Sequence, residues 1–271
     1  MATIDSRPTD RAGQFLTGVG LFVRALGMYV RQPRLMLLGA IPALISAALF
    51  VAAYALLVYF VLDLAALFTP FADDWSDGWR TLVRGIVVLA LLGLGGLLVV
   101  LTFTAVTLLV GDPFYEKISE QVEEWFGGVS DECEAPWWRS LGRSLADSAR
   151  LLGTTLLIAV PLLVIGLIPV VGQLTAAVLG ALVGGWFLAL ELVGVPFSRR
   201  GLTLADRRRI LKQHRPVAQG FGTAVFLCFL IPLGAVLTMP AAVIGGTLLA
   251  RRVLGLPVEP PAAAPAVGPG R

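Results

Sequence analysis

Two arginines stand at the start of the first long apolar run. The segment reads Arg31-Gln-Pro-Arg34-Leu35, and no charged residue follows until position 63. A helix that begins here places free backbone N–H groups and its positive dipole end beside two guanidinium groups. This pattern predicts an anion-binding site at Arg31, Arg34 and Leu35. The residues leave a second interpretation open, in which both arginines extend to lipid headgroups and bind no ligand.

Acidic residues gather in the segment 112–126. Asp112-Pro113 is typical of a helix start, and Gly127-Gly128 of a helix end. The helix would carry four glutamates, and we interpret them as a solvated face rather than as catalytic acids. They are Glu116, Glu120, Glu123 and Glu124.

A basic segment follows a capping pattern. Thr203-Leu-Ala-Asp206 predicts a helix start, because each side chain can bond the other's backbone N–H. Arg207, Arg208 and Arg209 come next. They favour either attachment to anionic lipid headgroups or an electropositive entrance that collects anions.

The sequence contains no catalytic or cofactor motif that we can identify. It lacks the Walker lysine pattern, His-Glu-x-x-His and Gly-x-Ser-x-Gly. Its two cysteines, Cys133 and Cys228, form no Cys-x-x-Cys pair. We therefore expect no enzyme activity, no cofactor and no metal site.

The composition identifies the kind of protein that must position these residues. Hydrophobic residues make up 57% of the 271 positions and charged residues 14%, and the mean hydropathy is +0.84. A soluble enzyme, a disordered chain and a secreted disulfide scaffold are all excluded by this balance. The chain is predicted to be an all-α integral membrane protein. The net charge of +3 does not indicate nucleic-acid binding, because the basic residues lie between apolar runs.

Four uncharged runs could enter a bilayer. They cover 35–62, 85–111, 151–190 and 216–250. The first two predict long single transmembrane helices, since about 20 residues cross the hydrocarbon core.

The two later runs each contain a proline–glycine break, at 168–173 and at 231–234. Each run is predicted to fold as a helical hairpin, with Met239-Pro240 closing the second break. Arms of about 11 to 17 residues are short for a crossing, so re-entrant hairpins that penetrate only part of the membrane are favoured. The expected arms are 151–167, 174–190, 216–230 and 240–250.

Basic residues predict the orientation. Loop 63–84 has two Lys or Arg residues, the fewest of any polar segment, and is expected outside. The remaining polar segments, including both termini, are then expected on the cytoplasmic side. Residues 12–31 carry Phe15, Val19, Phe22, Leu26 and Tyr29 on one helical face. They predict an interfacial amphipathic helix or, equally, a helix packed on the protein. We expect a single membrane domain at 12–254, between disordered segments at 1–11 and 255–271.

Three stretches together resemble the CysZ-type sulfate permeases, a bacterial branch of the etoposide-induced membrane protein superfamily. The resemblance spans about 15–254. The stretches are 111–123, 195–209 and 220–247. The motif positions they carry are Pro113, Phe114, Glu123, Pro196, Phe197, Arg199, Arg200, Pro232 and Pro240.

The resemblance implies two long transmembrane helices with two partly penetrating hairpins, and a homo-oligomeric working form. It also implies sulfate uptake across the inner membrane for cysteine biosynthesis. The family's anion site is a Gly-Leu-Arg-Arg stretch after a proline. Here Arg34 and Leu35 occupy its first two positions, while Met36 and Leu37 replace its arginines, so Arg31 and Arg34 are the cations left to bind the anion. A scaffold that keeps the fold without transporting is the alternative function.

Overall fold

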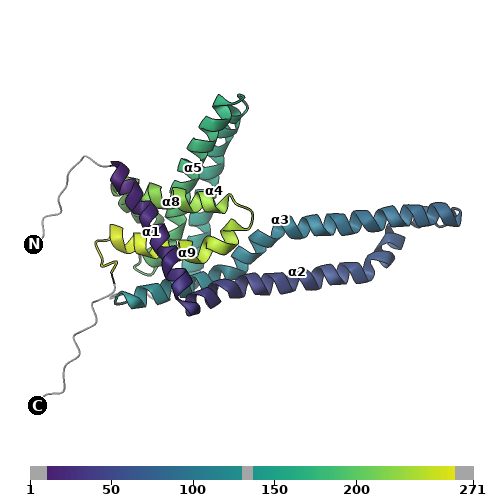
Figure 1. Ribbon diagram of the computed structural model, residues 1–271, viewed down its shortest axis with the longest axis horizontal. Helices are drawn as coiled ribbons and strands as arrows, with labels where there is room; N and C mark the ends of the chain where they lie inside the picture. Colours follow the sequence, from purple (N-terminus) through teal and green to yellow (C-terminus); the bar gives the residue numbers. More distant parts are fainter. Residues whose placement is uncertain (1–10, 130–136, 260–271) are drawn as a thin grey trace, which may run out of the picture. The chain divides into compact units, whose positions relative to one another are not determined.

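The computed structural model describes residues 11–129 and 137–259, and every regular element in these ranges is a helix (Figure 1). The helices gather into two compact units, residues 1–38 with 115–271 (unit 1) and residues 39–114 (unit 2). Of the segments expected to be disordered, 1–11 and 255–271, all but residues 11 and 255–259 lie outside the described residues. The elements are α1 (Arg11–Arg31), α2 (Pro33–Phe68), η1 (Pro70–Ala72), α3 (Asp77–Trp125), α4 (Trp137–Gly166), α5 (Val171–Leu192), α6 (Gly194–Ser198), α7 (Leu204–Gln213), α8 (Arg215–Phe229) and α9 (Gly234–Val253).

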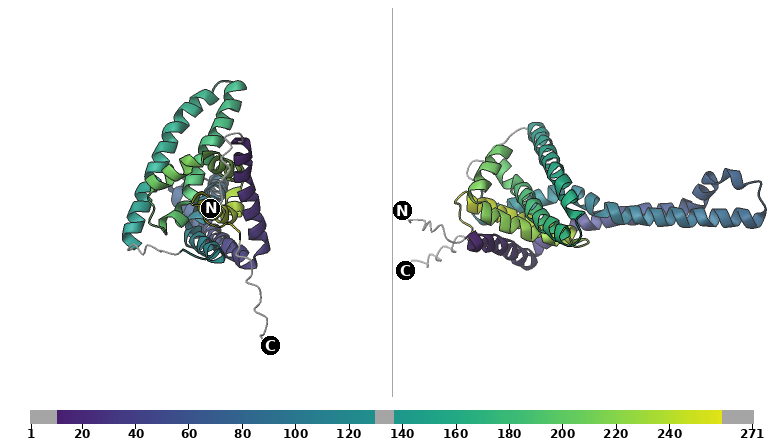
Figure 2. Two further views of the ribbon diagram at one scale, coloured as in Figure 1. Left: turned by 90° about the vertical axis from the view of Figure 1, so that its left-hand side faces the viewer. Right: turned by 90° about the horizontal axis from the view of Figure 1, so that it is seen from above.

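Unit 2 is made of the apolar parts of α2 and α3, which run side by side (Figure 2). The helices measure about 54 and 74 Å at 1.5 Å per residue, well beyond a hydrocarbon core of about 30 Å. The Tyr54 hydroxyl donates to the Leu92 carbonyl at 3.3 Å, and the rings of Phe50 and Phe103 lie 5.8 Å apart. Most other large apolar side chains of this pair are exposed, as expected of helices that face lipid. The prediction of two long helices is confirmed.

The prediction that a new helix begins at Asp112-Pro113 is wrong, because α3 continues through Pro113 to Trp125. Proline removes one backbone hydrogen bond, which costs about 3 kcal/mol inside a helix. The residues that follow offset this cost, since Tyr115, Ile118 and Val122 form a buried apolar face on the same helix. The predicted end at Gly127-Gly128 is confirmed.

Unit 1 is built around α9, the most thoroughly buried helix. Helices α1 and α8 pack against it and against each other, and α5 packs against α8. Glycines allow this closeness: a Cβ on Gly220 would lie 2.0 Å from the Phe15 carbonyl oxygen, and a Cβ on Gly222 would lie 1.8 Å from that of Gly185. Of the two interpretations of residues 12–31, the structure supports a helix packed on the protein, with Leu21 and Phe22 buried.

Both predicted hairpins are present. The breaks fall between α4 and α5 and between α8 and α9. The expected second arm at 240–250 is wrong, because Pro240 lies inside α9, which begins at Gly234. Within the part of the chain that the structure describes, five helices are long and apolar enough to cross a membrane: α1, α2, α3, α5 and α9. Length therefore no longer argues for re-entrant arms in α5 and α9.

The hairpin turns place a side chain, not a glycine, at the strained position. Val170 has φ 62° and ψ −70°, and the Val171 N–H donates to the Pro169 carbonyl at 2.8 Å, which makes a γ-turn. Leu233 has φ 60°, and the Gly234 N–H donates to the Ile231 carbonyl at 2.7 Å. The following glycines serve packing instead, since a Cβ on Gly234 would lie 2.0 Å from the Cys228 carbonyl oxygen.

Apolar side chains cover the tips of both hairpins and remain exposed. In the α8–α9 turn they include the strained Leu233, and in the α4–α5 turn the strained Val170. The exposed set is Leu163, Val164, Leu167, Ile168, Val170, Val171, Leu174, Leu227, Leu230, Ile231, Leu233 and Leu237.

Candidate functional site

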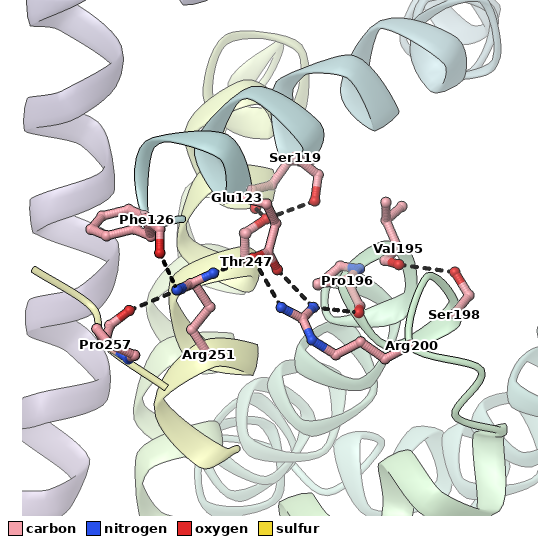
Figure 3. Close-up of polar contacts among 11 residues, drawn as sticks. Ser119, Glu123, Phe126, Val195, Pro196, Ser198, Arg200, Thr247, Arg251 and Pro257 are labelled. Atoms are coloured by element: carbon pink, nitrogen blue, oxygen red, sulfur yellow. Dashed lines mark hydrogen bonds and ion pairs between the residues drawn. The ribbon is translucent and has the colours of Figure 1, made fainter. Parts of the chain in front are cut away.

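A buried carboxylate in unit 1 contacts two arginines, one in the turn after α6 and one in α9 (Figure 3). Glu123, in the last turns of α3, is 1% exposed. Its carboxylate accepts hydrogen bonds from both terminal nitrogens of Arg200, at 2.7 Å to Nη1 and 2.9 Å to Nη2. Arg251 of α9 donates its Nη1 to the same carboxylate. We call Glu123, Arg200 and Arg251 the arginine–glutamate cluster.

Both guanidinium groups also donate hydrogen bonds to backbone carbonyls. Arg251 Nη2 donates to the Phe126 carbonyl at 2.8 Å and Nε to the Pro257 carbonyl at 2.9 Å. Arg200 Nη1 also donates to the Pro196 carbonyl at 2.7 Å. The Arg251 guanidinium lies 5.3 Å from the centre of the Phe126 ring, within cation–π range.

A hydroxyl pair lies beside the cluster. Ser119 Oγ and Thr247 Oγ1 are 2.9 Å apart, and both residues are fully buried. Ser119 is one helical turn before Glu123, and Thr247 one turn before Arg251. The hydrogen bond therefore ties α3 to α9 a second time, next to the ionic contact (Figure 3).

Local chain signals place each of the three charged residues near the end of a helix. Each lies close to a helix end that is closed by a glycine of positive φ: Gly127 after α3, Gly201 after α6 and Gly255 after α9. In each case a backbone N–H bonds back to a carbonyl five residues earlier, as from Gly128 to Glu123 at 2.9 Å. Helix C-termini carry partial negative charge, which favours the two arginines there.

The cluster holds two positive charges and one negative charge in a buried site. A desolvated bidentate Arg–carboxylate pair is geometrically specific, and loss of one partner leaves an uncompensated buried charge. The contacts indicate that the arginine–glutamate cluster holds α3, α6 and α9 together, and the cluster keeps one net positive charge. Among residues 11–129 and 137–259, no group of three or more His, Cys, Asp or Glu residues could hold a metal ion.

The expectation of a solvated face fails at one glutamate. Glu116 and Glu124 are exposed and Glu120 is half-buried, but Glu123 is buried. The interpretation was wrong for Glu123, because its burial depends on arginines 77 and 128 residues away, which helical periodicity cannot reveal.

The predicted anion-site residues take up different environments. Arg31 ends α1, and Arg34 lies in the first turn of α2, on either side of Gln32. Both arginines are exposed, whereas Leu35 is fully buried. The first turn of α2 carries no acidic residue, so its backbone N–H groups face no carboxylate from that turn.

The other motif positions divide between this cluster and structural roles. Pro196 accepts the Arg200 hydrogen bond, and Phe197 is fully buried in α6. Pro232 occupies the α8–α9 turn and Pro240 is buried in α9. Pro113 and Phe114 lie inside α3 and Arg199 follows α6.

Arg251 was missed by the reasoning from sequence. A signal was present, since Ile244, Leu248 and Arg251 follow the spacing of one helical face, and the first two are fully buried. An arginine on a buried face requires a buried partner.

Comparison with known proteins decides the family. Residues 21–240 match the family model described as Sulfate transporter CysZ/Etoposide-induced protein 2.4. The chain belongs to this family. Sulfate transporter CysZ of Pseudomonas fluorescens strain Pf0-1 is 31% identical over 222 residues, which are 81% of this chain and 87% of that relative.

Two further relatives of the same name differ in identity and in the share of each chain that matches. The protein of the same name from P. fluorescens strain Pf-5 is 37% identical, over 57% of this chain and 63% of that relative, so the match spans less than two thirds of it. The Vibrio atlanticus strain LGP32 relative is 28% identical over 91% of this chain and 94% of its own length. With the apolar helices, family membership establishes a multi-pass membrane protein.

Proposed function

We propose that this member of the CysZ family is a sulfate permease of the bacterial inner membrane that supplies sulfate for cysteine biosynthesis. The observation that carries the proposal is the match to a sulfate transporter CysZ over 87% of its length. That similarity favours a permease over a scaffold that keeps the fold without transporting.

Sulfate capture would rest on Arg31 and Arg34. Met36 and Leu37 are 43% and 64% exposed and offer no charge, so these two arginines are the cations beside the α2 N-terminus. An anion there would accept hydrogen bonds from the backbone N–H groups and charge-assisted hydrogen bonds from the two guanidinium groups.

The arrangement in the membrane is also a proposal. Helices α2 and α3 would cross the bilayer, and the α4–α5 and α8–α9 hairpins would enter from the cytoplasmic side with their exposed apolar tips inside. Helix α9 is covered by protein and needs no lipid contact. Both termini would be cytoplasmic. The working form would be a homo-oligomer, and the two units of each chain would belong to one membrane domain.

The test is uptake of radiolabelled sulfate by liposomes containing the purified full-length protein. We expect flux above that of empty liposomes, and a clear loss of flux in Arg34→Ala. Arg11→Ala removes an exposed arginine at the far end of α1 and should transport normally. Wild-type flux equal to empty liposomes would reject the permease. Normal flux in Arg34→Ala would reject only the role of Arg34.

A further inference from the structure

A second cationic site lies in unit 1, on helices α5, α7 and α8. A pocket of about 370 Å³ is lined by Trp186, Lys212 and Arg215. None of these residues belongs to the arginine–glutamate cluster or to the Arg31–Leu35 segment. Helices α5 and α8, which carry Trp186 and Arg215, pack against each other (Figure 1).

The corner between α7 and α8 builds the pocket. Helix α7 ends at Gln213 and α8 begins at Arg215, with His214 as the only residue between them. Lys212 therefore lies in the last turn of one helix and Arg215 in the first turn of the next. The Gln219 side-chain amide donates to the Leu182 carbonyl, which fixes this end of α8 against α5.

The pocket carries positive charge that its described lining does not neutralise. Lys212 and Arg215 are both exposed, and the described residues that line the pocket include no carboxylate. The Arg215 guanidinium lies 5.9 Å from the centre of the Trp186 ring. A cation–π contact positions the guanidinium without cancelling its charge.

The N-terminus of α8 adds to this field. No side chain caps it by a hydrogen bond, and Pro216 occupies the first turn. Its positive dipole end favours an anion, while the C-terminus of α7, separated from it by His214 alone, carries the opposite partial charge. The two cationic side chains therefore dominate the charge of the pocket. The indole, the ammonium and the guanidinium groups supply N–H donors of the kind that a tetrahedral oxyanion accepts.

The surroundings of Trp186 indicate the kind of oxyanion-bearing molecule that the pocket binds. It is half-buried and follows a part of α5 whose apolar side chains are exposed, among them Leu174, Val178 and Leu179. Tryptophan is enriched where an apolar surface meets a polar one, at the depth of lipid headgroups. We propose that the Trp186–Lys212–Arg215 pocket binds the phosphate group of an anionic membrane phospholipid.

Native mass spectrometry of the full-length protein in detergent tests the proposal. The probes are short-chain phosphatidylglycerol, phosphatidylcholine, inorganic phosphate and inorganic sulfate. We expect a phosphatidylglycerol adduct whose affinity falls roughly tenfold or more in Lys212→Gln/Arg215→Gln, since each cation near an anionic lipid surface contributes about fivefold. Arg209→Gln is the matched control, because it removes one exposed charge from α7 outside the pocket. Lys212→Gln alone, with an expected loss of about fivefold, serves if the double variant fails to fold.

The outcomes separate the sources of the oxyanion. Equal phosphatidylglycerol binding in wild type and Lys212→Gln overturns the proposal. So does binding of inorganic phosphate or sulfate with the same dependence on Lys212 and Arg215 when phosphatidylglycerol does not bind. Because no arm measures transport, failure here leaves the proposed permease function unaffected.

Discussion

The carboxylate of Glu123 accepts two parallel hydrogen bonds from the guanidinium of Arg200, 77 residues further along the chain, at 2.7 and 2.9 Å. Both side chains lie largely out of solvent, at 1% and 14% exposed. The planar guanidinium matches the two oxygens in a way that the single ammonium of lysine cannot. This contact fixes the end of α3 to the segment after α6.

Glu123→Gln removes the negative charge that compensates Arg200 and Arg251. We expect a loss of about 3–5 kcal/mol in unfolding free energy, the cost typical of breaking a buried pair. Chemical denaturation in detergent micelles measures it. Glu120→Gln is the control, because Glu120 pairs with the exposed Lys117 on the same helix and should cost under about 1 kcal/mol. Equal losses of unfolding free energy in the two variants would contradict a stabilising role of the arginine–glutamate cluster.

The Ser119–Thr247 hydrogen bond predicts energetic coupling between α3 and α9. Ser119→Ala and Thr247→Val should each destabilise the protein, and the double variant should lose less than their sum by about 1 kcal/mol. Denaturation of the wild type and the three variants gives this coupling directly. Strict additivity would mean that the two hydroxyls do not interact.

Replacing glycine by alanine is expected to have opposite effects on stability at two positions, Gly220 and Gly20. Gly220→Ala would bring a Cβ within 2.0 Å of the Phe15 carbonyl oxygen, so α1 must move away from α8 and we expect destabilisation of about 1–3 kcal/mol. Gly20→Ala meets no atom within 4 Å and should stabilise α1 by about 0.5–1 kcal/mol. Thermal unfolding of both variants provides the comparison, and a stable Gly220→Ala would be inconsistent with the close packing.

Asp206 predicts pH dependence at the start of α7. Hydrogen bonds from the Thr203 hydroxyl and then the Thr203 backbone N–H lower the pKa of Asp206 below 3.8, with Arg209 contributing less. Because the folded pKa is depressed, the stabilisation is present above about pH 3.8 and is lost as the pH falls through the folded pKa. Amide exchange in α7, corrected for intrinsic rates, should be slower in wild type than in Asp206→Asn at pH 6, and the difference should disappear in acid. A difference that persists at the lowest pH would contradict the role of the carboxylate.

The proposed topology predicts opposite labelling of two loops. After replacement of Cys133 and Cys228 by serine, a cysteine at Asp74 should react with an impermeant maleimide in intact cells. A cysteine at His214 should react only after the cells are opened. Asp74 and His214 are both exposed in the structure, so accessibility within the protein does not confound the comparison. Labelling of His214→Cys from outside would refute hairpins that return to the cytoplasmic side.

Local signals gave the most reliable predictions. Gly127-Gly128 ends α3, and Thr203 and Asp206 form the reciprocal capping box that their spacing indicates. Both proline-containing breaks fall close to their expected positions. Each of these features depends on backbone hydrogen bonds within a few residues, so a short stretch of sequence contains what is needed.

Prediction failed where distant contacts outweigh local preference. Pro113 and Pro240 lie inside helices because buried residues continue on the same helix beyond them. Glu123 resembles its exposed neighbours in the sequence, and only the folded chain brings Arg200 and Arg251 to it. The anion-binding roles of Arg31 and Arg34 stay predictions.

The two hairpin turns make unit 1 dependent on its surroundings. Glycine at position 170 or 233 would relax the backbone, where a non-glycine residue costs roughly 1–2 kcal/mol, but it would also remove an exposed apolar side chain. Within a bilayer, transfer of that side chain out of water offsets the cost. In an aqueous setting this compensation is lost, so the stability of these two turns depends on whether lipid or water surrounds them.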